Sequence, residues 1–149
     1  MGEFIFLRIL GIDLGEKRIG ISISDELGIT AQGLPTINSI NEIEDLKNIK
    51  KIIDKYGVEK VILGLPINMN GSLGEQAKKA ISFAIELKEF FQLPVELEDE
   101  RLSTSKAEKF LIETDRSRKK RKKVIDKMSA VIILQSFLDR RMMNKEIKK

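Results

Sequence analysis

The order of apolar and polar positions predicts that the chain begins with three consecutive strands. Residues 5–12 are mostly apolar, as expected of a strand buried on both faces. From residue 18 to 25, isoleucines alternate with small or polar residues, which is the period of a half-buried strand. A third strand is expected over about 29–37, where Gly33 and Pro35 favour the edge of a sheet or a bulge.

The period then changes to that of a helix. Apolar residues recur every three or four positions over 41–56, Ser39 or Asn41 can cap the start, and Gly57 ends the helix. A short apolar strand follows over 60–65. Four elements complete the chain: a helix to about Phe91, a strand over 94–100, a shorter helix to about Ile112 and a last helix over 124–141.

Ser72 and Glu75 have the spacing of a capping box for the helix that ends near residue 91. The order of elements predicts an α/β fold with a mixed five-stranded sheet, its first three strands antiparallel and the rest parallel, and helices on both faces. We expect a single domain over residues 1–149, with about the last eight residues frayed.

The composition excludes several kinds of active site. The 149 residues include no His and no Cys, so a Ser-His-Asp triad, a cysteine nucleophile and zinc sites of thiolate or imidazole are ruled out. Clustered carboxylates without nitrogen ligands suit a hard cation such as Mg²⁺ or Mn²⁺. No apolar run could span a membrane, and no secretory signal or disulfide framework is present, so a cytoplasmic location is expected.

Positive charge is concentrated in one segment. The formal net charge is only +4, but residues 116–123, "RSRKKRKK", are basic at seven of eight positions. Such a run can be a solvated surface. Its charge density also suits a nucleic-acid partner, whose phosphates would neutralise it.

Carboxylates follow two of the expected strands and one lies on the last helix. Asp13 ends the first strand, the acids of "EDE" (98–100) end the last one, and Asp126 shares a helical face with Ala130, Ile133 and Phe137. Functional groups gather at the carboxyl ends of parallel strands, and a carboxylate on an apolar face calls for a cation. Each acid alone also suits a turn, a helix cap or an ion pair, but together they could converge on a metal.

With their flanking residues, these acids form motifs that resemble a known family. The segments "GIDLGEKRIGISISD", "VILGLPINMNGSLGEQA", "DERLSTSKA" and "KKVIDKMSAVIILQSFL" look like the four motifs of the YqgF family, also called RuvX, a branch of the RNase H-like fold. The resemblance extends from about Leu7 to Leu138. Members are described as Holliday junction resolvases or as nucleases of pre-16S ribosomal RNA 5′ ends.

The resemblance implies that Asp13, the acid of "DER" and Asp126 are catalytic and bind two divalent ions, Mg²⁺ or Mn²⁺. Strand alternation lets only one of Asp99 and Glu100 face the site, and we favour Glu100, with Glu98 as a third choice. The expected contacts to nucleic acid are Lys17, Arg18, Arg101, Arg116, Arg118, Lys119, Lys120, Arg121, Lys122, Lys123 and Lys127. The loop of residues 66–72 is either a further contact or a plain turn.

The function that this resemblance implies is hydrolysis of phosphodiester bonds, with the 5′ end of pre-16S rRNA as the substrate, in ribosome biogenesis. The first alternative is a Holliday junction resolvase-like endonuclease acting on branched DNA. Two alternatives come from other classes: a nucleic-acid-binding module without catalysis, and an actin-like ATP-binding domain, which also opens with a glycine-rich turn and an Asp. The sequence leaves the oligomeric state open.

Overall fold

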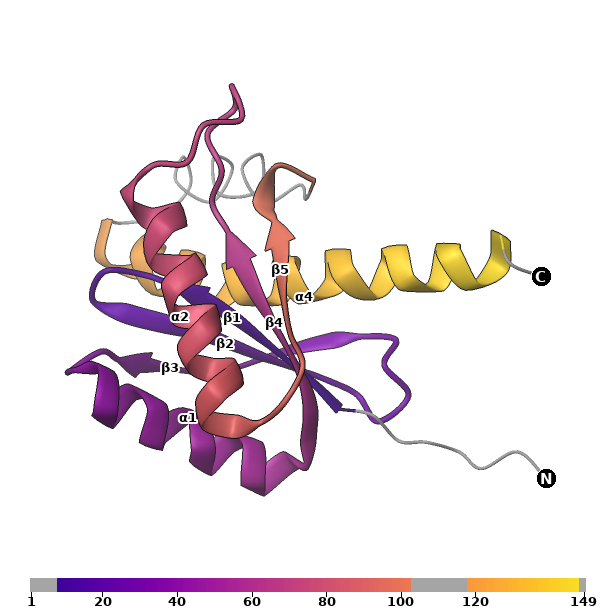
Figure 1. The fold of residues 1–149 in the computed structure, drawn as a ribbon, viewed down its shortest axis with the longest axis horizontal. Coiled ribbons are helices and arrows are strands. Elements are labelled where there is room, and N and C mark those ends of the chain that lie inside the picture. The colour runs from indigo at the N-terminus through magenta and orange to yellow at the C-terminus, as the bar shows by residue number, and fades with distance from the viewer. Residues whose placement is uncertain (1–7, 103–117, 148–149) are drawn as a thin grey trace.

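The computed structural model (Figure 1) describes residues 8–102 and 118–147, with the side chains of α4 described over 128–144. The elements in chain order are β1 (Arg8–Leu14), β2 (Arg18–Ser24), β3 (Ala31–Asn38), α1 (Glu42–Tyr56), β4 (Val58–Leu65), α2 (Glu75–Phe91), β5 (Val95–Asp99), the 3-10 turn η1 (Glu100–Leu102) and α4 (Arg118–Ile147).

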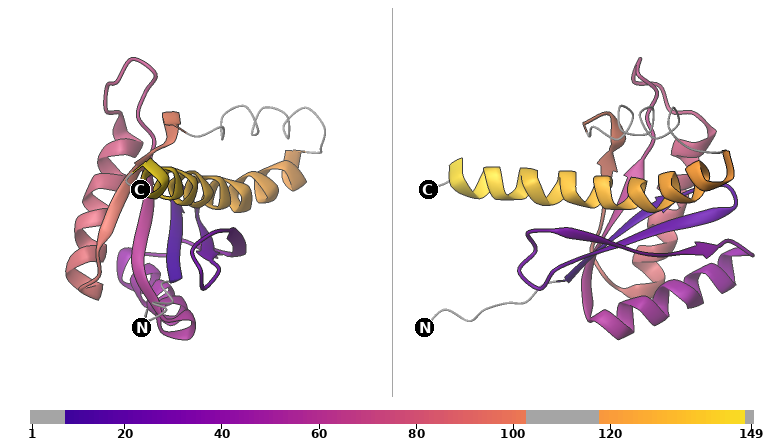
Figure 2. Two further views of the ribbon diagram at one scale, coloured as in Figure 1. Left: turned by 90° about the vertical axis from the view of Figure 1, so that its right-hand side faces the viewer. Right: turned by 180° about the vertical axis from the view of Figure 1, so that it is seen from behind.

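The five strands form one sheet in the order β3-β2-β1-β4-β5. The pairs β3–β2 and β2–β1 are antiparallel, whereas β1–β4 and β4–β5 are parallel. Helices α1 and α2 cover one face, and α4 crosses the other face (Figures 1 and 2). The mixed α/β sheet with helices on both faces is therefore confirmed. Among the described helices, none is long and apolar enough to cross a membrane.

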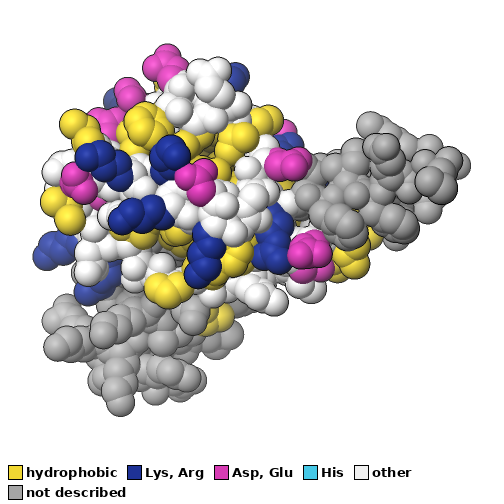
Figure 3. All heavy atoms as spheres, turned by 90° about the horizontal axis from the view of Figure 1, so that it is seen from below, with side chains coloured by type: hydrophobic (Ala, Val, Ile, Leu, Met, Phe, Trp, Pro, Cys, Tyr) yellow, Lys and Arg dark blue, Asp and Glu magenta, His cyan; other side chains and the backbone are white. Residues whose placement is uncertain are grey.

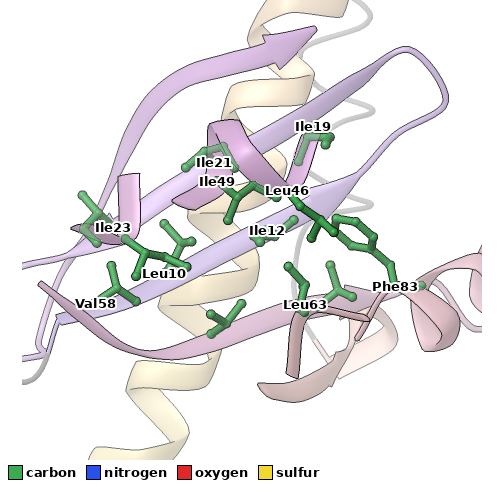
Figure 4. Packing of buried hydrophobic residues seen from close by; sticks show 14 residues of the cluster. Leu10, Ile12, Ile19, Ile21, Ile23, Leu46, Ile49, Val58, Leu63 and Phe83 are labelled. Carbon is green, nitrogen blue, oxygen red and sulfur yellow. The ribbon is translucent and has the colours of Figure 1, made fainter. Parts of the chain in front are cut away.

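Side-chain alternation along the strands divides the core into two layers. Leu10 and Ile12 of β1 lie in the larger cluster, with α1 and α2 (Figure 4). Ile9 lies in a second cluster with Ile133 and Leu134 of α4. Odd-numbered residues of β1 therefore face α4, and even-numbered ones face α1 and α2.

Small residues allow α4 to approach the sheet closely. A methyl group on Gly11 would lie 2.8 Å from Cβ of Leu134 and 3.2 Å from the carbonyl oxygen of Ala130. That same carbonyl accepts a 2.7 Å hydrogen bond from Oγ of buried Ser22. Glycine at position 11 thus makes room for the backbone of α4.

Most local predictions hold for the first helix. Asn41 caps α1 by accepting a hydrogen bond from the backbone N–H of Glu44, and Gly57 ends it in the left-handed conformation with φ of 65°. β3 is an edge strand, as Gly33 and Pro35 predicted.

Other predictions were wrong or fall outside the described residues. The capping box is absent: Gly74 occupies the N-cap of α2, and Ser72 instead bonds Asn70 within the loop. The last helix is longer than expected, from residue 118 to 147, because Lys and Arg favour helix and the basic segment continues it. It therefore includes most of the residues expected to fray, and the shorter helix to about residue 112 lies outside the described ranges.

Candidate functional site

The acidic part of the site begins with Asp13, near the carboxyl end of β1. Asp13 is half-buried and lies opposite Gly20 of β2. It has the parity of Ile9 and Gly11, so strand alternation places it on the α4 face. Ile12 pairs with Leu63 of β4, and the next residues along the two parallel strands, Asp13 and Gly64, are therefore level with each other.

Glu100 reaches the same place from the other side of β4. It is the first residue of η1, directly after β5, and is only 8% exposed. A methyl group on Gly64 would lie 3.5 Å from the carboxyl carbon of Glu100 and 2.6 Å from Cδ1 of Ile133. The Glu100 carboxyl therefore lies over β4 on the α4 face, one strand from Asp13. Gly64 provides the space for it.

Asp99 has a different environment. Its carboxylate accepts hydrogen bonds from the Arg101 backbone N–H at 2.9 Å, from Nε at 3.2 Å and from Nη2 at 2.9 Å. These bonds from the guanidinium, opposed by partial burial, hold the pKa of Asp99 below its ordinary value. Asp99 is thus ion-paired with Arg101. Glu100 is the acid of "DER" that shares a face of the sheet with Asp13.

Glu98 also faces α4, and it has a cation of its own. It is 3% exposed, and its Oε1 accepts a hydrogen bond from Nη2 of Arg140 in α4, while its buried Oε2 has no hydrogen-bond partner among the described residues. Sequence reasoning missed Arg140, because nothing in the sequence links it to an acid 42 residues away.

The third expected acid, Asp126, lies in the first part of α4, and its side chain is outside the described residues. One helical turn later, Ala130 is fully buried against β2. Within the part of the chain whose side chains are described, no group of three acids could hold a metal. Asp13 and Glu100 are the two candidate ligands that lie on one face of the sheet, on either side of β4.

Several expected cations lie at the same end of the sheet. Lys17 is exposed in the turn after β1, where the backbone N–H of Gly15 donates a 2.9 Å hydrogen bond to the carbonyl oxygen of Arg18. Arg18 is half-buried, and Arg101 directly follows Glu100. The backbone of 118–123 and of Lys127 belongs to α4, but their side chains and all of Arg116 are outside the described set.

The opposite end of the molecule has a different surface. Lys and Arg side chains are interspersed with Asp and Glu on the face seen from below, where α1 lies (Figure 3). Pairs such as Lys50–Asp54, at 2.9 Å, are typical of an ordinary solvated helix. Of the two ends, the one with Asp13 and Glu100 is the better candidate for a functional site.

Comparison with known proteins supplies the family. A family model described as "RuvX: Holliday junction resolvase" matches residues 7–140. A protein of Geobacillus kaustophilus is 57% identical over 135 residues, which is 89% of this chain and 98% of that protein. A protein of Clostridium kluyveri is 52% identical over 134 residues, covering 90% and 98%. Both bear the name "Putative pre-16S rRNA nuclease".

A solved structure supports the fold. The structure "T. thermophilus RuvC in complex with Holliday junction substrate" matches with a TM-score of 0.57 at 12% identity, over 91% of this chain and 96% of that one. At this identity the likeness concerns the fold alone, which is RNase H-like. The family match and the identity to its relatives together establish that the chain belongs to the RuvX family.

Proposed function

We propose that this chain is a nuclease that depends on a divalent metal and hydrolyses phosphodiester bonds at the 5′ end of pre-16S rRNA. The observation that carries the proposal is the placement of Asp13 and the buried Glu100 on one face of the sheet, at the ends of the strands on either side of Gly64. The names of the relatives support ribosomal RNA as the substrate.

The donor set fits a hard cation. Asp13 and Glu100 supply only carboxylate oxygens, the ligands that Mg²⁺ and Mn²⁺ prefer, and Asp126 would complete the set from α4. Asp13, Glu100 and Asp126 would hold the divalent metal, and its chemistry there would be to lower the pKa of the attacking water and to stabilise the leaving 3′ oxygen.

The chain's own cations would bind and orient the substrate. Lys17 and Arg18 lie in and after the turn that follows Asp13, and Arg101 follows Glu100, so phosphates on either side of the cut would meet positive charge. The basic residues at the start of α4 would hold more of the backbone and make binding strongly dependent on salt.

A second candidate is cleavage of four-way DNA junctions, which the description of the family model favours. The same acids would act on the same kind of bond. Symmetric cleavage of a junction would in addition require two copies of the site at a fixed spacing.

The test compares cleavage of a pre-16S rRNA 5′ leader with that of a four-way DNA junction, with Mg²⁺ or Mn²⁺ and with EDTA. We expect metal-dependent cutting of the RNA. Asp13→Asn should slow cutting by about 100-fold or more, because it removes a metal ligand, while the nucleic acid still binds. The control is Asp54→Asn in α1, which exchanges the same groups on an exposed helix and should cut normally. Normal cutting by Asp13→Asn would refute the site, and preference for the junction would favour the second candidate.

A further inference from the structure

We propose that the loop between β4 and α2, residues 66–74, contacts an unpaired base of the nucleic acid through Met69. This inference rests on the proposed function and names the part of the substrate that the site would recognise. The loop starts two residues after Gly64, at the end of the sheet that carries Asp13 and Glu100. In Figures 1 and 2 it rises beyond the end of β4 as the tallest point of the drawn chain.

Internal hydrogen bonds give the loop a defined shape. The backbone N–H of Asn68 donates to the carbonyl oxygen of Ser72 at 3.1 Å, and that of Gly71 donates to the carbonyl oxygen of Asn68 at 2.8 Å. The Asn70 side chain accepts from both the N–H and the hydroxyl of Ser72, at 3.0 and 2.6 Å. Gly71 has φ of 86°, a conformation that other residues rarely adopt. A loop ordered in advance loses little entropy when it binds.

This ordered loop presents apolar side chains to solvent. Met69 is 72% exposed and Leu73 is 45% exposed, so neither is held by the core. Leu102 of the neighbouring η1 is 64% exposed. The hydrogen bonds that shape the loop join Asn68, Asn70, Gly71 and Ser72, and the exposed Met69 side chain takes no part in them. A methionine is well suited to contact an aromatic ring, because its thioether is polarisable and its side chain adapts to the surface that it meets.

Arg101 adds a fixed cation beside the loop. The Asp99 carboxylate accepts hydrogen bonds from Nε and Nη2 of Arg101. Nη1 of Arg101 lies 3.7 Å from the position that a methyl group on Gly71 would occupy. The guanidinium is therefore held in one orientation next to the loop tip. A planar, fixed guanidinium can bind a phosphate or stack on a base.

The combination favours an unpaired nucleotide over a duplex. In a duplex the faces of the bases are stacked on one another, and only phosphates and base edges are available. An unpaired nucleotide offers an open aromatic face to Met69 and a phosphate to Arg101 at the same time. Single-stranded RNA and DNA share these groups, so both are included in the test.

The chain contains no Trp, so a single introduced tryptophan can report the contact. In an Asp13→Asn background, which prevents cutting, Met69→Trp should lose fluorescence when single-stranded RNA or DNA binds, because a base stacks on the indole. A blunt duplex should leave the fluorescence unchanged. The matched control is Met143→Trp on α4, since Met143 is 60% exposed, and its signal should not change with any of the three. Binding is followed separately by the anisotropy of a labelled oligonucleotide.

Affinity provides a second measurement. Met69→Ala should weaken binding of the single strands by about two- to tenfold, the range for a thioether on an aromatic ring, and leave duplex binding unchanged. Met143→Ala should change neither. If the single strands bind but the fluorescence of Met69→Trp stays constant, or if Met69→Ala weakens duplex and single strands equally, the inference is wrong while the proposed function stands. Absence of any nucleic-acid binding would refute the proposed function, and this inference with it.

Discussion

Replacing Gly64 with alanine tests the packing that places Glu100 beside Asp13. The added methyl group would lie 2.6 Å from Cδ1 of Ile133, about 1 Å inside an ordinary carbon–carbon contact, but at a normal 3.5 Å from the carboxyl carbon of Glu100. Ile133 is fully buried and cannot move into solvent. We therefore expect Gly64→Ala to lower the free energy of unfolding by about 1–3 kcal/mol, as overpacking does.

A second substitution identifies the cause. Ile133→Val removes Cδ1 and, alone, should cost about 1 kcal/mol as a lost methylene. The nearest remaining Ile133 atom, Cγ1, would then lie 3.4 Å from the new methyl group, a contact that slight relaxation accommodates. The double variant should therefore be more stable than the sum of the single effects predicts, by about 1 kcal/mol or more.

Urea unfolding at constant pH measures all three variants. The midpoints should shift with an unchanged slope, since only packing in the folded state changes. Gly74→Ala is the matched control, because its methyl group would meet Asn68 at an ordinary 3.6 Å, and its effect should add to that of Ile133→Val. Additive effects of Gly64→Ala and Ile133→Val would refute the packing argument.

Two further predictions concern the acids next to Glu100. Arg140→Leu leaves the buried Glu98 carboxylate without its cation, so it should lower the free energy of unfolding, measured in urea, by about 2 kcal/mol. Adding Glu98→Leu should restore most of that loss. An Arg140→Leu variant as stable as the original chain would contradict this. The pKa of Asp99 is lowered in the fold, so its ion pair with Arg101 stabilises the protein above the unfolded pKa, near 3.8, and this stability is lost as the pH falls through the folded value. Carbon-13 NMR of the Asp99 carboxyl should show its pKa rising in Arg101→Gln, and an unchanged pKa would contradict the cause.

Features set by local spacing could be predicted from the sequence. Asn41 and Gly57 sit directly at the ends of an amphipathic stretch, and both cap α1 as expected. Alternation along the last strand also predicts that neighbouring acids face opposite sides, and in the structure Glu98 bonds Arg140 whereas Asp99 bonds Arg101. These inferences need only the backbone geometry of one element.

Features that depend on a distant partner could not be predicted. A glycine within a strand marks a bulge, a bend or a close approach, and only the position of α4 shows that Gly11 and Gly64 are close approaches. The start of α4 was placed too late because a run of like charges suggests a solvated segment, although the helix continues through it. The capping box failed because the hydroxyl of Ser72 bonds within its own loop.

The continuity of α4 links these packing details to the proposed chemistry. One uninterrupted helix carries residues 118–123 of the basic segment, Asp126 and the buried residues that lie on the sheet. Its position is set by contacts along its length: the carbonyl oxygen of Ala130 accepts from Ser22 at 2.7 Å, and Gln135 bonds the backbone of Ala31 at 2.9 Å. A helix held in this way cannot shift at Ile133 without moving the backbone at 126 relative to Asp13. The Gly64→Ala variant should therefore lose cutting activity as well as stability. Adding Ile133→Val should restore the activity and the stability together, because the contact between residues 64 and 133 controls both properties.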